Sequence, residues 1–142
     1  MILLDTDHLS ILQHAESEAA DALRLRLKQS VDRDIGTTVI SLEEQSRSWL
    51  DLIRRYSDAR QQVEYYARFA DAIRFFEGWW ILPFDGDAAN QFRILRAARI
   101  RIGTSDLKIA AIALTSDATL LTRNLRDFSQ VPGLRVENWI GP

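Results

Sequence analysis

Short apolar runs alternate along the chain with longer amphipathic stretches, as expected when strands alternate with helices. Five apolar runs predict strands, at residues 2–4, 35–40, 79–84, 119–122 and 134–136. Apolar residues spaced three or four apart predict helices, over about 8–14, 18–29, 41–56, 58–76, 87–99 and 106–115, with a turn or short helix at 124–128. This order predicts one α/β domain over residues 1–142, with a mostly parallel central sheet of about five strands flanked by helices.

Two central helices have clear start signals. Ser41 and Glu44 have the spacing of a capping box, which predicts a helix from Ser41 through Tyr56. Asp58 is expected to cap the next helix, which would run to about Phe76. Apolar residues recur along that second helix and predict a buried face, formed by Val63, Tyr66, Ala67, Ala70, Ile73 and Phe76.

Composition excludes several classes of protein. Hydrophobic residues make up 46% and charged residues 27% of the chain, which are ordinary globular values. No apolar run approaches the roughly 20 residues of a membrane helix, and the first residues lack the basic region of a signal peptide. There is no cysteine, which suits a reducing compartment. We therefore expect a cytoplasmic protein with no membrane partner.

The chain has few residues for sulfur or imidazole chemistry. With no cysteine, thiolate zinc sites are excluded, and a Ser-His-Asp triad or a multi-histidine metal site would have to be built from His8 and His14 alone. Both histidines are predicted to be surface residues of the first helix. Any chemistry must therefore rest on the 20 acidic side chains.

Acidic residues follow several of the predicted strands. Asp5 directly follows the first strand, Glu44 lies just after the second, and Asp127 follows the fourth. Asp106 opens a helix that is apolar almost all round and is therefore expected to be buried. Ligands of parallel sheets collect beyond the carboxyl ends of the strands. Four carboxylates there would repel one another unless protons or a hard cation such as Mg²⁺ or Mn²⁺ neutralised them.

Four segments of the sequence resemble the motif blocks of PIN-domain nucleases. They are residues 3–7 (LLDTD), 38–44 (TVISLEE), 104–114 (TSDLKIAAIAL) and 120–128 (LLTRNLRDF), and residues 131–139 also fit. The compact form is similar to VapC-type toxins of bacterial type II toxin–antitoxin modules. The resemblance implies a Rossmann-like PIN fold and a Mg²⁺-dependent endoribonuclease that hydrolyses RNA phosphodiester bonds with a metal-activated water, with Mn²⁺ able to substitute. It also implies a homodimer held inactive by a cognate antitoxin.

The resemblance assigns roles residue by residue. Asp5, Glu44 and Asp106 match the catalytic acids that hold the metal, with Glu44 preferred over Glu43. Asn124 stands where many members of the family have a carboxylate, which leaves Asp127 as the fourth catalytic acid and a possible metal ligand. Supporting positions around the metal are Asp7, Thr122 and Asn124. A glycine common in the family is replaced by Ser48.

The charge distribution suggests where RNA would bind. Residues 1–89 carry 10 basic and 16 acidic side chains, whereas residues 90–135 carry eight basic and three acidic ones. Arginine matches phosphate oxygens with two parallel hydrogen bonds. The RNA-binding candidates are Arg96, Arg99, Arg101, Arg123 and Arg126.

Two other functions remain open from the sequence. The asparagine at 124 is compatible with a catalytically weak PIN-like module that binds RNA or an antitoxin. The Asp5-Thr6-Asp7 sequence after a first strand is also found in phosphotransfer through an aspartyl-phosphate. Such a site needs a lysine beside the phosphoryl group, and Lys108 is poorly placed for that role.

Overall fold

The computed structural model describes residues 1–13 and 16–141, so the predicted surface position of His14 lies outside the described residues. The strands are β1 (Ile2–Leu4), β2 (Ile35–Thr38), β3 (Trp80–Leu82), β4 (Thr119–Leu121) and β5 (Arg135–Glu137). The helices are α1 (Thr6–Gln13), α2 (Glu18–Gln29), α3 (Val39–Arg54), α4 (Ala59–Glu77), α5 (Gly86–Ala97), α6 (Thr104–Thr115) and α7 (Leu125–Phe128). None of these helices is long and apolar enough to cross a membrane.

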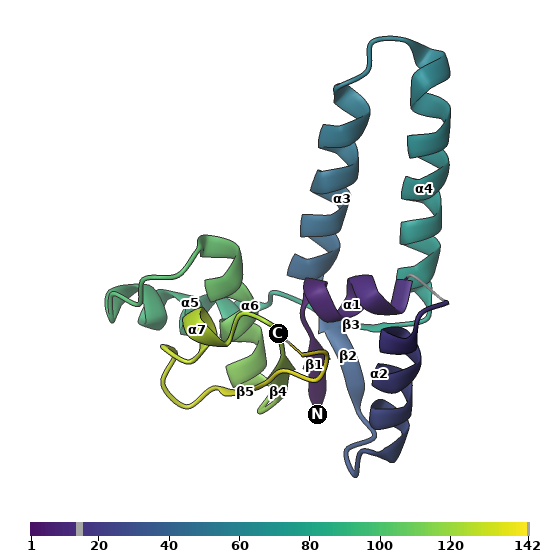
Figure 1. The fold of residues 1–142 in the computed structure, drawn as a ribbon. Coiled ribbons are helices and arrows are strands. Elements are labelled where there is room, and N and C mark those ends of the chain that lie inside the picture. Colours follow the sequence, from purple (N-terminus) through teal and green to yellow (C-terminus); the bar gives the residue numbers. More distant parts are fainter. Residues whose placement is uncertain (14–15, 142) are drawn as a thin grey trace.

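The five strands form one sheet in the order β3-β2-β1-β4-β5, and every pair is parallel. This confirms the predicted α/β class. After β1 the chain moves to one side to form β2 and β3, and it returns through α5 and α6 to form β4 on the other side of β1 (Figure 1). The strand order therefore reverses between β1 and β4, and such a reversal opens a crevice at the carboxyl ends of parallel strands.

The central strand divides the core into two layers. Leu3 packs into a cluster with the buried faces of α5 and α6, whereas Ile2 and Leu4 pack with α1, α2 and Phe76. This alternation follows from the two-residue period of a strand. As predicted, α6 is apolar almost all round and buried, with Ile109, Ala110 and Ala113 inaccessible to solvent.

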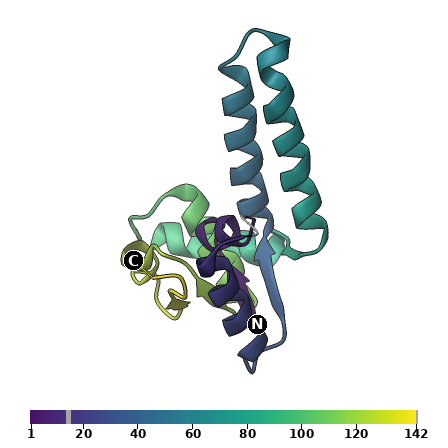
Figure 2. The ribbon, with the colours of Figure 1, turned by 45° about the vertical axis from the view of Figure 1, so that its right-hand side comes forward.

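Helices α3 and α4 form a hairpin that stands away from the sheet in both ribbon views (Figures 1 and 2). The predicted buried face of α4 is wrong, because only Phe76 of that set is buried. Val63 is 62% exposed, Tyr66 54% and Ile73 39%. The spacing of these residues indicates a helix with one apolar face, but the fold carries most of that face beyond the core.

Helix α3 begins earlier than the sequence predicts. Thr38 is its N-cap, because the Thr38 hydroxyl accepts the Ser41 N–H at 3.2 Å. Ser41 is therefore a buried helical residue, and the predicted capping box with Glu44 is wrong. Strand β2 correspondingly ends at Thr38 rather than at residue 40. The earlier start places Glu44 in the second turn of α3.

We predict that Gly36→Ala destabilises the fold. Gly36 pairs with Trp80 across β2 and β3, and a Cβ at position 36 would lie 2.6 Å from the Trp80 carbonyl oxygen. The two strands would have to separate, so we expect a loss of about 1–3 kcal/mol in the free energy of unfolding, measured by urea denaturation.

The matched control is Gly86→Ala at the first residue of α5, where a Cβ meets nothing within 4 Å. This substitution restricts the unfolded chain and is expected to leave stability unchanged or raise it by up to about 1 kcal/mol. Equal stability of Gly36→Ala and wild type would contradict the close approach of the two strands.

Candidate functional site

Five acidic side chains meet at the carboxyl edge of the sheet. Asp5 and Asp7 follow β1, Glu44 comes from α3, Asp106 lies in the first turn of α6, and Asp127 lies in α7 after β4. The fold brings them close enough for charge repulsion to act between Asp5 and Asp106, between Glu44 and both of these, and between Asp106 and Asp127. The reversal of strand order next to β1 is therefore lined with carboxylates.

Asp5 is the most buried of these acids, with 7% of its surface exposed. Its carboxylate accepts hydrogen bonds from the Thr6 N–H at 2.7 Å and from the Thr122 hydroxyl at 2.9 Å. Burial, followed by repulsion from Asp7 and Asp106, raises the pKa of Asp5 to about 6 against the favourable hydrogen bonds. Thr122 thus orients the carboxylate of Asp5.

Glu44 has an incompletely paired carboxylate. Its Oε2 atom accepts one long hydrogen bond, from the Thr6 hydroxyl at 3.5 Å. Its Oε1 atom is buried and has no hydrogen-bond partner among the described residues. Burial, with repulsion from Asp5 and Asp106, raises the pKa of Glu44 to about 7. A buried oxygen atom that no hydrogen-bond donor contacts is available to coordinate a cation or to accept a hydrogen bond from a ligand.

Asn124 bridges the other two acids. Its side-chain amide donates to Asp127 at 3.0 Å and to Asp106 at 3.4 Å, while its carbonyl oxygen accepts the Asp127 N–H at 3.4 Å. Burial and repulsion from Asp127 raise the pKa of Asp106. The hydrogen bond from Asn124 lowers the pKa of Asp106 and so offsets part of this repulsion.

Asp7 accepts hydrogen bonds from His8 and from the backbone of Arg123. Burial works to raise the pKa of Asp7, but hydrogen bonds from His8 and from the Arg123 N–H outweigh it and hold that pKa below its usual value. The Thr122 hydroxyl also lies 3.5 Å from the Asp7 carboxylate. Asp7 therefore fixes the chain after β4 beside the chain after β1.

The predicted surface position of His8 is wrong, because this residue is completely buried. Its Nε2 atom accepts the Trp139 N–H at 3.1 Å, so its proton is on Nδ1 and is donated to Asp7 at 2.6 Å. A signal in the sequence could have identified this position, since His8 stands four residues before buried Leu12 and so shares its helix face.

The five arginines of the RNA-binding prediction are all exposed. Arg123 and Arg126 flank Asn124 and so lie at the edge of the carboxylate cluster. Arg96 lies on α5, where its guanidinium stands 5.5 Å from the Phe92 ring centre, and Arg99 and Arg101 lie on the connection from α5 to α6. The backbone N–H of Arg123 contacts Asp7, while its guanidinium donates to the Gly141 carbonyl at 3.4 Å. Arg126 precedes Asp127 on α7, and the other three arginines lie on a separate segment.

The carboxylate oxygens of the cluster are of the type that hard cations prefer. Among residues 1–13 and 16–141, no three acidic or histidine side chains are already positioned as metal ligands. The oxygen donors, the unpartnered Glu44 oxygen and the raised pKa values of Asp5 and Glu44 are nevertheless features that a divalent cation would relieve.

Comparison with known proteins gives one family over nearly the whole chain. The family model described as PIN domain matches residues 2–134. Among curated proteins, Ribonuclease VapC1 of Rickettsia felis is 53% identical over 60 residues, which cover 39% of this chain and 45% of the relative. The tRNA(fMet)-specific endonuclease VapC of Salmonella typhimurium is 36% identical over 63 residues, 42% of this chain and 48% of the relative. Each match spans less than half of the curated relative.

Solved structures share the fold over a longer range. VapBC from Salmonella typhimurium, bound to DNA, matches with a TM-score of 0.72 at 23% identity and covers 97% of both chains. VapBC2 from Rickettsia felis, bound to a DNA fragment from its promoter, matches with a TM-score of 0.69 at 23% identity over 98% of this chain and 99% of the other. At this identity the likeness concerns the fold alone.

We predict that Glu44→Gln stabilises the metal-free protein at pH 8. Because the folded state raises the pKa of Glu44 from 4.5 to about 7, the native protein holds this proton more tightly than the unfolded chain. The stability that this tighter proton binding gives to the folded protein is fully present below about pH 4.5 and is lost as pH rises through about 7. Since Glu44 is only half-buried, we expect a gain of roughly 1–2 kcal/mol at pH 8 in EDTA, and a smaller gain at pH 5.

The control is Glu43→Gln on the same helix, where the carboxylate is exposed and paired with Arg47 at 3.0 Å. Thermal unfolding of this variant should follow the wild type within about 0.5 kcal/mol. If Glu44→Gln proves less stable than wild type at pH 8, charge repulsion at Glu44 is not the dominant effect.

Proposed function

The chain belongs to the PIN-domain family, and we propose that it is a divalent-metal-dependent endoribonuclease, the toxin of a toxin–antitoxin module. The observation that carries this proposal is the meeting of Asp5, Glu44 and Asp106 at the carboxyl edge of the sheet, with a buried Glu44 oxygen that lacks a partner. A site of this kind suits a cation and, through it, a phosphodiester.

Asp5, Glu44 and Asp106 would hold Mg²⁺ or Mn²⁺, and Asp127 is the further candidate ligand. All four are oxygen donors, which these hard cations prefer over other metals. When bound, such an ion activates water and stabilises the negative charge that develops on a phosphodiester during hydrolysis. Because the pKa values of Asp5 and Glu44 lie near 6 and 7, a cation would keep both ionised at neutral pH.

The surrounding side chains orient these acids. Thr122 donates to Asp5, and Thr6 contacts both Asp5 through its N–H and Glu44 through its hydroxyl. Asn124 holds Asp106 beside Asp127. These hydrogen bonds place the carboxylates before substrate arrives, which reduces the reorganisation required during reaction. Arg123 and Arg126, at the rim, would offset the negative charge that an approaching RNA backbone meets there.

The names of the similar proteins support the RNA substrate and an antitoxin partner. The curated relatives are a ribonuclease and a tRNA(fMet)-specific endonuclease, and the solved structures with this fold are VapBC complexes and other toxin–antitoxin assemblies. We extend these properties to this chain as part of the proposal, together with a homodimer and a cytoplasmic location.

The position of Lys108 does not support the alternative function, phosphotransfer through an aspartyl-phosphate. Its ammonium lies 5.6 Å from the Phe84 ring centre and 6.0 Å from that of Phe92. The lysine thus packs on Phe84, which follows β3, and on Phe92 of α5 rather than beside Asp5. A module that binds RNA without cleaving it remains the alternative that the experiment below distinguishes.

We predict that Asp106→Asn abolishes metal-dependent RNA cleavage. The substitution keeps the size of the side chain but removes a carboxylate from the cluster, so cleavage should fall by on the order of 100-fold or more. The measurement is digestion of total cellular RNA by purified protein with Mg²⁺, with Mn²⁺ and with EDTA, resolved on a denaturing gel.

Asp87→Asn is the matched control, since Asp87 occupies the first turn of α5 as Asp106 occupies that of α6, but is exposed and outside the cluster. It should cleave as the wild type does. Equal cleavage by Asp106→Asn and wild type, or cleavage that persists undiminished in EDTA, would reject the proposed function. RNA binding without any cleavage in either metal would favour the binding module.

A further inference from the structure

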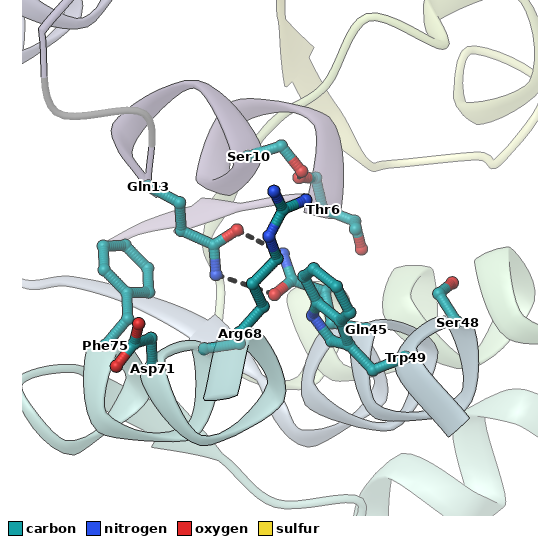
Figure 3. Close-up of a pocket in the computed structure, with 10 residues that line it drawn as sticks. Thr6, Ser10, Gln13, Gln45, Ser48, Trp49, Arg68, Asp71 and Phe75 are labelled. Carbon is teal, nitrogen blue, oxygen red and sulfur yellow. Dashed lines mark hydrogen bonds between the residues drawn. The ribbon is translucent and has the colours of Figure 1, made fainter. Parts of the chain in front are cut away.

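A groove of about 650 Å³ lies next to the carboxylate cluster (Figure 3). One face of each of three helices lines it: Thr6 and Gln13 come from α1, Gln45 and Trp49 from α3, and Arg68 and Phe75 from α4. A groove of this volume lies within the size range of ligand sites in proteins. None of the four proposed metal-binding carboxylates lines it, so its lining residues are distinct from those of the cluster.

The groove is continuous with the cluster at one end. Thr6 lines the groove, while its hydroxyl contacts Glu44 and its N–H contacts Asp5. Gln45, which also lines the groove, directly follows Glu44 on α3. If a polymer binds with one of its linkages at the carboxylates, the unit next to that linkage would therefore lie in the groove.

The floor of the groove carries a pair of amides suited to recognising the edge of a planar ring. Gln13 and Gln45 exchange hydrogen bonds of 2.7 and 3.1 Å, drawn as dashed lines in Figure 3. This exchange uses one N–H and one carbonyl lone pair of each amide, so each keeps a second donor and a second acceptor position. Paired donors and acceptors of this type are what amide side chains offer to base edges.

The walls of the groove are aromatic and carry little net charge. Trp49 and Phe75 are half-buried and line opposite helices of the hairpin. Arg68 is paired with Glu64 at 2.5 Å, and Asp71, which also lines the groove, is paired with Arg74 at 2.8 Å. Such a surface favours an uncharged ring, because aromatic faces stack on bases and the one cation and one anion that line the groove are each paired within α4.

We propose that this groove is a nucleobase subsite, which takes the base of a nucleotide adjacent to the RNA linkage held at the carboxylates, with Trp49 as the stacking surface and the Gln13–Gln45 pair reading the base edge. The inference rests on the proposed function for the position of the linkage. It adds a source of sequence preference that the carboxylates cannot supply, since they contact only the phosphodiester.

The test measures binding separately from cleavage. Fluorescently labelled single-stranded octaribonucleotides of A, C, G or U are titrated with protein in Ca²⁺, a hard cation that the carboxylates can hold in place of Mg²⁺, and followed by anisotropy. The wild type should bind the four octamers with unequal affinity. Trp49→Ala should weaken binding of the preferred octamer by about 5- to 100-fold, the range for removing one base-stacking contact.

Two further variants complete the design. Trp80→Ala removes an exposed tryptophan on β3 outside the groove and should bind within about twofold of the wild type. The double variant Gln13→Leu/Gln45→Leu replaces both amides with apolar side chains of similar size, so that neither partner is left unpaired. It should keep affinity for RNA but bind the four octamers almost equally. Thermal unfolding establishes that each variant is folded.

The results separate this proposal from the proposed function. Unchanged binding by folded Trp49→Ala, or unchanged preference in the double variant, overturns the subsite even if the wild type cleaves RNA. Weakened RNA binding by Trp49→Ala supports the subsite even if no metal restores cleavage. If Trp49→Ala leaves RNA binding intact but loses a co-purifying protein, the groove is a protein-binding surface and the subsite is rejected.

Discussion

Repulsion among carboxylates at the carboxyl edge of the sheet is the constraint on which the rest of this structure depends. The fold places Asp5, Glu44 and Asp106 close together although their negative charges repel one another. Both burial and repulsion from neighbouring carboxylates raise their pKa values. Thr6, Thr122 and Asn124 donate hydrogen bonds to these carboxylates and so stabilise their charges. These donors satisfy part of the cluster and leave one Glu44 oxygen without a partner. We therefore expect the metal-free arrangement to be less stable than a neutral one, as is common where a site is shaped for function.

Much of the fold could be predicted from the sequence because its patterns are local. The apolar runs identified all five strands, and the apolar character of the helix after Asp106 predicted its burial. The start of α3 was misplaced because Ser41–Glu44 satisfies the capping pattern as well as Thr38 does, and only the end of β2 decides between them. The exposed face of α4 could not be predicted, since spacing indicates an apolar face but not what covers it.

The acidic residues of the candidate site could be predicted from the sequence, whereas most of the hydrogen bonds around them could not. Their position after parallel strands follows from the order of elements, whereas hydrogen bonds that join distant segments do not. Thr122 reaches Asp5 across 117 positions of the sequence, and the backbone of Trp139 reaches His8 across 131. The bridging role of Asn124 also depends on the turn that leads into α7. The groove beside the cluster was not apparent in any single motif, because three helices contribute to it.

The pairing of β1 with β4 also has a consequence for the synthesis of the chain. Asp5 is made 117 positions before Thr122, and residues 106–127 supply the later donors and acids of its surroundings. Until that segment has left the ribosome, the first strand has no β4 to pair with and the cluster cannot assemble. A growing chain therefore has no complete acidic centre until the segment through Asp127 has been made.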